Sequence, residues 1–119
     1  MKRVEDLDVF KLSHALALEI YKLTSHFPKD EMYGLVSQMR RAATAVSSNL
    51  VEGAGRNSRA EYRHFVGVAK GSAGEIRYQL LLATDLGYLS REEGIRLQGE
   101  YGRVMQMLTK LIRSLGSEK

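Results

Sequence analysis

Hydrophobic residues recur at helical spacing in four segments of the chain. Within each segment they fall at i, i+3 or i+4 and i+7, so about 3.6 residues per turn places them on one face of a helix. The four stripes are Val9, Leu12, Leu16, Ile20, Leu23 and Phe27; Met32, Leu35, Val36, Met39, Ala42, Ala43, Val46 and Leu50; Tyr62, Phe65, Val66, Ala69, Ala73, Ile76, Leu80 and Ala83; and Tyr101, Val104, Leu108, Leu111, Ile112 and Leu115. This pattern predicts four amphipathic α-helices, each with one face turned toward a common core.

Signals for helix ends stand between the stripes. Pro28 separates the first two stripes, and Asp30 is placed to cap the second helix. Ser58 and Ser90 are each followed three residues later by a glutamate, which is typical of a capping box at a helix start. Gly87 stands where a glycine is expected after the third helix.

The connections between the predicted helices are short, about three to six residues. Short connections make consecutive helices antiparallel neighbours. The chain has 119 residues and a single proline, which favours helix and a single folding unit. We therefore expect an all-α protein that forms one domain over residues 1–119, an antiparallel up-down-up-down four-helix bundle.

Composition excludes several classes of site. The chain has no cysteine, which excludes disulfides, thiolate metal ligands and a cysteine nucleophile. Its first residues lack the apolar segment of a signal peptide, and its longest apolar run, near residues 80–83, is far shorter than the roughly 20 residues of a membrane span. We expect a cytoplasmic protein that has no membrane partner.

Candidate catalytic groups are sparse. The segment Gly53-Ala54-Gly55-Arg56 follows a predicted helix and lacks the spacing and the preceding strand of a phosphate loop, so it is interpreted as the end of the second helix. Glu61 and His64 form one Glu-x-x-His motif, whereas di-iron bundles require two. We expect no enzymatic activity, no catalytic residue, no metal site and no cofactor.

Two helices carry small or polar residues away from their apolar stripes. The third helix has Gly67, Gly71 and Gly74 close to a stripe roughly 130° from its core centre. Each glycine inside a helix costs about 1 kcal/mol relative to alanine, a cost that close approach of another backbone would offset. A comparable stripe of the second helix, roughly 80–100° from its core centre, contains Gln38, Arg41, Ala45, Asn49 and Glu52.

The first helix adds a second apolar stripe, Phe10, Ala17 and Tyr21, set away from its core face. Together these faces predict a homo-oligomer, because they are built for contact but do not belong to the core stripes. The alternative is a thicker core that reaches further round each helix. The predicted assembly face contains Phe10, Tyr21, Gln38, Asn49, Glu52, Gly67, Gly71 and Gly74.

Positive charge is concentrated in the middle of the chain. Residues 38–78 contain seven basic and three acidic residues, so this segment (7 − 3 = +4) carries the whole formal net charge of +4. Such a segment predicts an anionic partner, RNA or DNA. The alternatives are a solvated basic surface, or ion pairs between subunits that use Glu52, Glu61 or Glu75. The candidate nucleic-acid-binding residues are Arg41, Arg56, Arg59, Arg63, Lys70 and Arg77.

Several sequence blocks together resemble a known family. The blocks are Asp6-Leu-x-Val-Phe10, Phe27-Pro28, Tyr33-Gly34-Leu35-x-x-Gln38-x-Arg40-Arg41-Ala42-Ala43, Ser48-Asn49-x-x-Glu52-Gly53, Arg56, Tyr62, Phe65, Ala69-x-Gly71-Ser72 and Glu75. They resemble the bacterial four-helix bundle protein family, first noticed as reading frames within intervening sequences of large-subunit ribosomal RNA genes. The resemblance implies a ring-shaped homopentamer without enzymatic activity. The family is also similar to the accessory subunit of diversity-generating retroelements, a basic pentamer that works with a reverse transcriptase and RNA.

Two positions depart from the family pattern. Ser47 stands where the family often has proline, so a kink in the second helix is not implied, and Phe10 stands where it usually has tryptophan.

Three hypotheses follow for the function. The first is an oligomer that binds nucleic acid, the second is an adaptor that binds a protein such as a polymerase, and the third, an enzyme, has the least support.

Overall fold

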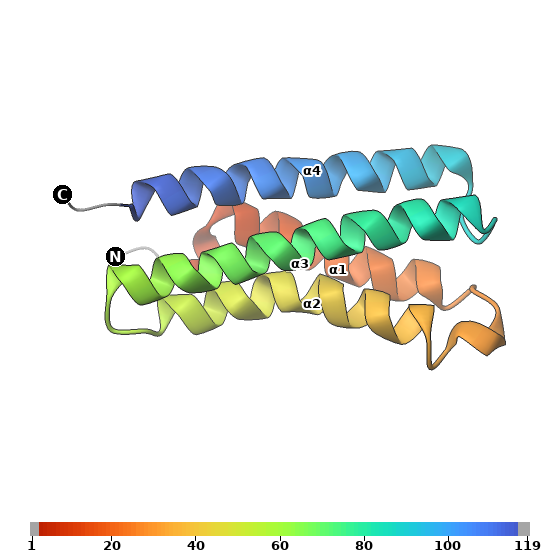
Figure 1. The fold of residues 1–119 in the computed structure, drawn as a ribbon, viewed down its shortest axis with the longest axis horizontal. Helices are drawn as coiled ribbons and strands as arrows, with labels where there is room; N and C mark the ends of the chain where they lie inside the picture. The colour runs from red at the N-terminus through yellow and green to blue at the C-terminus, as the bar shows by residue number, and fades with distance from the viewer. Residues whose placement is uncertain (1–2, 117–119) are drawn as a thin grey trace.

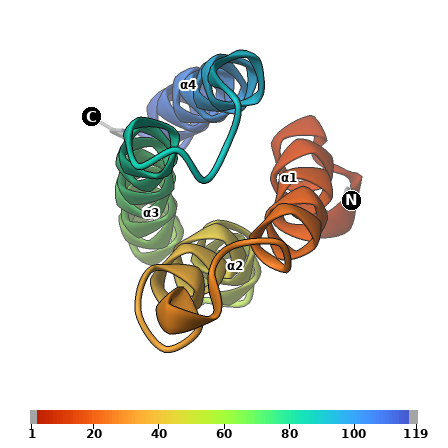
Figure 2. The ribbon, with the colours of Figure 1, turned by 90° about the vertical axis from the view of Figure 1, so that its right-hand side faces the viewer.

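Four α-helices run alternately up and down along one long axis in residues 3–116, the part of the chain that the structure, a computed structural model, describes (Figure 1). The axial view shows the helices arranged in chain order around a common centre, with α3 between α2 and α4 (Figure 2). The expected all-α, up-down-up-down bundle is confirmed. The helices are α1 (Asp8–Thr24), α2 (Leu35–Ala54), α3 (Arg59–Asp85) and α4 (Arg91–Ser114), with short 3-10 helices η1 (Val4–Asp6) and η2 (Lys29–Glu31).

The core is made by the predicted stripes, to which the structure adds Ala17 and Leu97. Ile20, Val46, Ile76 and Leu108, one from each helix, are completely buried. Met32 is the exception, since its side chain is 49% exposed. The second helix begins at Leu35, so Met32 lies in the preceding turn and never joins the helical stripe.

The helix ends follow local signals in most places. Ser58 and Ser90 each accept a hydrogen bond from the backbone N–H three residues on, at 3.1 Å, and so cap α3 and α4 as expected. Gly87 has a φ of 84°, in the left-handed region that favours glycine. The backbone N–H of Tyr88 then reaches the carbonyl of Ala83 at 2.9 Å, which closes the end of α3 as a Schellman motif.

The start of α2 differs from expectation. The chain makes the 3-10 turn η2 before the helix, so Asp30 lies too early to cap it and the prediction for Asp30 was wrong. Glu31 takes the role, because its Oε1 accepts the backbone N–H of Leu35 at 3.3 Å. Its Oε2 accepts the hydroxyl of Tyr88 at 2.8 Å, which joins this turn to the α3–α4 connection and raises the pKa of Tyr88.

Glycine permits close approach at both ends of α3. A β-carbon at Gly53 of α2 would lie 2.8 Å from the β-carbon of Phe65 in α3. A β-carbon at Gly94 of α4 would collide with the side chain of Thr84. Gly53 is therefore part of the α2–α3 packing. The helix α2 ends at Ala54 with Gly55 as its C-cap residue, so the prediction that the glycine segment ends a helix is confirmed.

Polar side chains join α1 to its neighbours. Ser13 is completely buried and shares a hydrogen bond of 2.8 Å with Ser47 of α2. Ser47 lies within the unbroken helix Leu35–Ala54, where a proline would remove a backbone hydrogen bond. Across the other seam, Arg96 of α4 bonds to Glu19 of α1 and, at 2.7 Å, to Glu93 of its own helix.

Two buried polar atoms, Gln79 Oε1 and the Tyr101 hydroxyl, have no hydrogen-bond partner within the described residues. Burial, with a smaller contribution from the negative charge of Glu19, raises the pKa of Tyr101. A hydroxyl that is buried without a partner loses its hydrogen bonds to water and makes no hydrogen bond in the folded protein, which costs free energy of folding. Both side chains therefore lower the stability of the core relative to apolar groups of the same shape.

Tyr101→Phe should leave the free energy of unfolding unchanged or raise it by about 1 kcal/mol, because it removes the unpaired hydroxyl and retains the ring. Tyr88→Phe is the matched control, since it removes a hydroxyl that bonds to Glu31; it should lower the same quantity. Urea denaturation at one protein concentration measures both. A loss larger than that of the control would show that the Tyr101 hydroxyl is paired.

Gly53→Ala should lower the free energy of unfolding by about 1–3 kcal/mol, because the new methyl group overpacks the contact with Phe65. Gly99→Ala in α4 is the control, because nothing in the described chain lies within 4 Å of its added β-carbon. It should raise the stability by up to about 1 kcal/mol through helix propensity alone. Equal behaviour of the two variants in denaturant would contradict the close contact.

Candidate functional site

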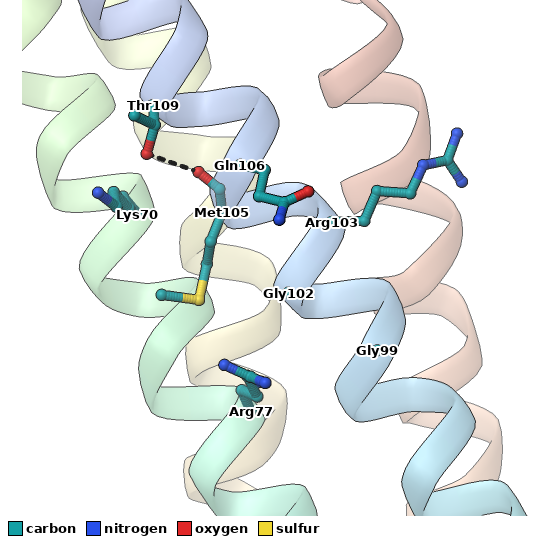
Figure 3. A pocket seen from close by; sticks show the side chains of 8 residues that line it. All are labelled: Lys70, Arg77, Gly99, Gly102, Arg103, Met105, Gln106 and Thr109. Carbon is teal, nitrogen blue, oxygen red and sulfur yellow. Dashed lines mark hydrogen bonds between the residues drawn. The ribbon is translucent and has the colours of Figure 1, made fainter.

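A groove of about 630 Å³ runs along the outer side of α3 and α4 (Figure 3). Helices that pack side by side leave such a groove wherever the facing side chains are small, and here α4 contributes two glycines to it. The groove contains two of the predicted nucleic-acid-binding residues. Its lining residues are Lys70, Arg77, Gly99, Gly102, Arg103, Met105, Gln106 and Thr109.

Lys70 and Arg77 form the positive wall of this groove. They are seven residues apart on α3, so they project from the same side of the helix about 10 Å apart along its axis. Met105 reaches from α4 and lies between them (Figure 3). The guanidinium of Arg77 lies over Gly102, 3.7 Å from the position of an added β-carbon. Within residues 3–116, neither cation has a carboxylate within 4.0 Å.

The groove continues into an apolar hollow of about 410 Å³, with which it shares Arg77 and Met105. Tyr78 and Leu81 of α3 line this hollow, and their side chains are 59% and 43% exposed. The outer side of α3 and α4 is therefore basic at one end and apolar at the other. Gly74 lies on the floor, 3.6 Å from Met105 when a β-carbon is added.

The glycines of α3 lie outside the core, as their helical positions predict. Among the described residues, nothing lies within 4 Å of a β-carbon added at Gly67 or Gly71. These two glycines do not serve packing within the described part of one chain. Gly74 differs, because it is half-buried beside Met105.

The polar stripe of α2 lines a second groove, of about 350 Å³, between α2 and α3. Gln38 and Arg41 face Glu75 of α3 across it. Asn49 lies further along α2 and donates its side-chain N–H to the carbonyl of Ala45 at 2.8 Å. Arg41 and Glu75 thus share one groove, which reduces the positive charge that this side offers to an anion.

Two of the predicted basic residues stabilise the fold. Arg56 forms an ion pair of 2.6 Å with Glu52 and lies 4.8 Å from the centre of the Phe65 ring. Arg63 donates to the backbone carbonyl of Leu115 at 2.9 Å and so satisfies the C-terminal end of α4. Arg59 is exposed at the first position of α3.

The second apolar stripe of α1 was only partly right. Ala17 is buried in the core, and Phe10 is half-buried against it with its ring 6.2 Å from His14. The thicker core, which was the alternative, accounts for Ala17, whereas the half-buried Phe10 keeps part of its surface exposed. Tyr21 remains exposed, with the guanidinium of Arg40 4.7 Å from its ring centre.

Sequence patterns did not identify the α4 side of the basic groove. Gly102, Arg103 and Met105 lie outside residues 38–78, the segment that carries the formal net charge, so the charge pattern did not mark them. Arg103 points away from Lys70 and Arg77 (Figure 3) and lies 3.5 Å from Glu100. Gly99 and Gly102 are one turn apart, which is a signal of the same kind as the α3 glycines.

Residues 3–116 contain no cluster of three or more histidine, cysteine, aspartate or glutamate side chains that could hold a metal ion. In the same range, no helix is both long and apolar enough to cross a membrane.

Comparison with known proteins places the chain in a family. The profile described as 23S rRNA-intervening sequence protein matches residues 5–110. A solved structure from Bacteroides thetaiotaomicron, a protein with unknown function from the S23 ribosomal protein family, is similar with a TM-score of 0.78 and 23% identity over 87% of this chain and 97% of that one. That identity shows a shared fold alone, and comparison with curated proteins gives no match. Because the profile spans most of the sequence, the chain belongs to the 23S rRNA-intervening sequence protein family.

Proposed function

We propose that this protein is a non-enzymatic homo-oligomer, a pentamer by its family resemblance, that binds the phosphate backbone of RNA or DNA on its outer basic surface. The observation that carries the proposal is the groove between α3 and α4. Lys70 and Arg77 project into it together, and within the described residues neither is neutralised by a carboxylate. Two adjacent cations without internal partners favour an external anion.

Phosphate is the anion that fits this surface best. Lysine and arginine contacts to phosphate supply most non-specific affinity for nucleic acid and carry no sequence information. Gly99 lines the groove and, among the described residues, nothing lies within 4 Å of a β-carbon added there, so a backbone can approach closely at that point. Repetition around a ring of five would multiply the net charge of +4 to about +20.

The assembly rests on the glycines of α3. Gly67 and Gly71 cost helix stability and have no packing neighbour within the described part of one chain. A second backbone that approaches this face would explain why they are not alanine, and small residues allow such approach between helices. The absence of cysteine from the sequence is consistent with the cytoplasm, where we place this assembly.

A protein-binding adaptor is the second candidate function. It is favoured by the apolar hollow that adjoins the basic groove, where Tyr78 and Leu81 are exposed. Exposed aromatic and aliphatic side chains beside a cation are common at protein interfaces. The partner would be a nucleic-acid enzyme, such as a polymerase or a reverse transcriptase, that the ring holds close to RNA.

Replacing Lys70 and Arg77 together by glutamine tests the nucleic-acid proposal. Affinity of the wild-type protein for non-specific RNA should be in the range of about 10⁻⁴–10⁻⁶ M, and its logarithm should fall linearly with the logarithm of salt concentration. Loss of two phosphate contacts should flatten that slope by about 1.4–1.8. Fluorescence anisotropy over a salt series measures the slope, and circular dichroism confirms that the bundle is folded.

The control removes the same charge elsewhere, by Lys11→Gln with Arg91→Gln, two exposed positions outside the groove. This pair should change the slope much less. Equal effects of the two pairs would show that total charge, and not the groove, governs binding. Absence of binding by the wild-type protein at about 50 mM salt would remove the nucleic-acid function and leave the adaptor.

Gly71→Leu should weaken the assembly without loss of helix content, because it adds bulk to an exposed face of α3 and improves helix propensity. Ala15→Leu on the exposed side of α1 is the control for an added surface leucine. Sedimentation velocity at micromolar concentration should show dissociation for the first variant alone. A wild-type protein that sediments as a monomer would contradict the oligomer.

A further inference from the structure

A third groove, of about 420 Å³, lies between α1 and α2. The sequence patterns marked Tyr21 and Arg41 separately, but did not bring them together with Tyr33. The volume of this groove falls within the range of about 300–1,000 Å³ that is usual for small-molecule sites. Among the described residues that line it, two are tyrosines, two are arginines and none is acidic. The groove therefore combines aromatic rings and positive charge, which come from two helices and the turn between them.

Tyr33 is the most exposed large side chain of the groove. It lies in the turn before α2, in the orange segment at the right-hand end of Figure 1, and 95% of it is exposed. A tyrosine ring normally buries much of its surface, because it offers a large apolar area with one polar end. The turn holds the backbone of Tyr33 in place, since Glu31 bonds both to Leu35 at the start of α2 and to Tyr88.

The second ring, Tyr21, is held rigid by Arg40. The Arg40 side chain donates to the hydroxyl of Thr24 at 2.9 Å and to the carbonyl of Tyr21 at 3.1 Å. Its guanidinium stacks on one face of the Tyr21 ring, 4.7 Å from the ring centre. Arg40 thereby fixes the wall of the groove.

Arg41 supplies the positive charge of this groove. It also lines the α2–α3 groove that contains Glu75, but within the described residues it makes no ion pair with that carboxylate within 4.0 Å. It is exposed and bonds to the hydroxyl of Ser37 at 3.3 Å, a weak neutral contact that an anion can replace. The hydroxyl of Thr44 lies in the same lining; it donates to the backbone carbonyl of Arg40 at 2.9 Å, so it can accept a hydrogen bond from a ligand. One exposed ring and one exposed guanidinium thus share a groove whose lining is free of carboxylates among the described residues.

We propose that this groove binds an unpaired nucleobase of single-stranded nucleic acid, with the base stacked on Tyr33 and the adjoining phosphate held by Arg41. Base stacking on an aromatic ring, together with a cation for the backbone, is how proteins bind single strands without sequence preference. In a duplex the base faces are already stacked on one another, so Tyr33 has nothing to stack on. The groove therefore makes the basic surface selective for single strands.

This proposal rests on the proposed function, because it assumes that the protein binds nucleic acid. It adds a site on a different pair of helices from the α3–α4 groove and a preference that phosphate contacts alone do not give. The two claims can be separated by experiment, since loss of the ring should affect one probe and loss of the charges should affect both.

The test measures affinity for a labelled oligouridylate and for an RNA duplex of the same number of nucleotides per strand, by fluorescence anisotropy with the whole protein. Tyr33→Ala should weaken binding of the single strand at least about fivefold and change duplex binding less than about twofold. Tyr33→Phe, which keeps the ring, should behave as the wild type. Ile95→Ala controls for the loss of an exposed apolar side chain elsewhere.

Each other outcome overturns the proposal in a different way. If Tyr33→Ala binds both probes as the wild type does, the stacking site is wrong and the phosphate-binding function stands. If the wild-type protein binds neither probe at about 50 mM salt, both claims fall. If Tyr33→Ala alters the sedimentation of the assembly, Tyr33 lies between copies of the chain and is not a nucleobase site.

Discussion

Close approach of α3 to both of its neighbours is the constraint on which the rest of the bundle depends. Gly53 of α2 admits Phe65 at one end of α3, and Gly94 of α4 admits Thr84 at the other. A β-carbon at either glycine would push a helix outward, and an unbroken α3 would transmit that shift along its length. The position of α3 is therefore fixed at both ends by the absence of a side chain on its neighbour.

The position of α3 between α2 and α4 determines which of its side chains are exposed on the surface of the protein. Because α2 and α4 cover its inner side (Figure 2), the cations and glycines of α3 lie outside the core, where Lys70 and Arg77 border a groove shared with α4. Tightly packed helices make a rigid support, so the spacing of these two cations is set by the helix itself. The same rigidity applies to the groove beside Arg41, whose wall is held by Arg40.

The basic residues divide into two groups with different physical roles. Arg40 and Arg63 donate to backbone carbonyls at the ends of α1 and α4, where unsatisfied carbonyls remain and a positive charge is favourable. Arg56 is neutralised by Glu52. Arg77 and Lys70 make no ion pair within the described residues. Their charges are therefore not cancelled by a neighbouring carboxylate, and each contributes more to the positive field around the protein than a paired arginine such as Arg56 does.

Most of the fold could be predicted from the sequence because helix periodicity and helix caps are local. The stripes around Ile20 and Leu108, and the caps at Ser58 and Ser90, depend on residues within a few positions of each other. The candidate sites could be predicted only in part. Residue positions on a helical wheel predicted that Lys70 and the α3 glycines lie outside the core. They could not predict that Lys70 shares a groove with Met105 of α4.

Contacts between distant residues were decided by the tertiary structure alone. Arg63 meets Leu115 across 52 positions of the sequence, and Glu31 meets Tyr88 across 57. Such pairs form only when elements that are distant in the sequence pack at a particular separation, which Gly53 sets between α2 and α3 and Gly94 sets between α3 and α4. Local hydrogen bonds and hydrophobic spacing determine that four helices form and which face of each is buried, whereas the side chains that meet across helices depend on how closely the helices can approach.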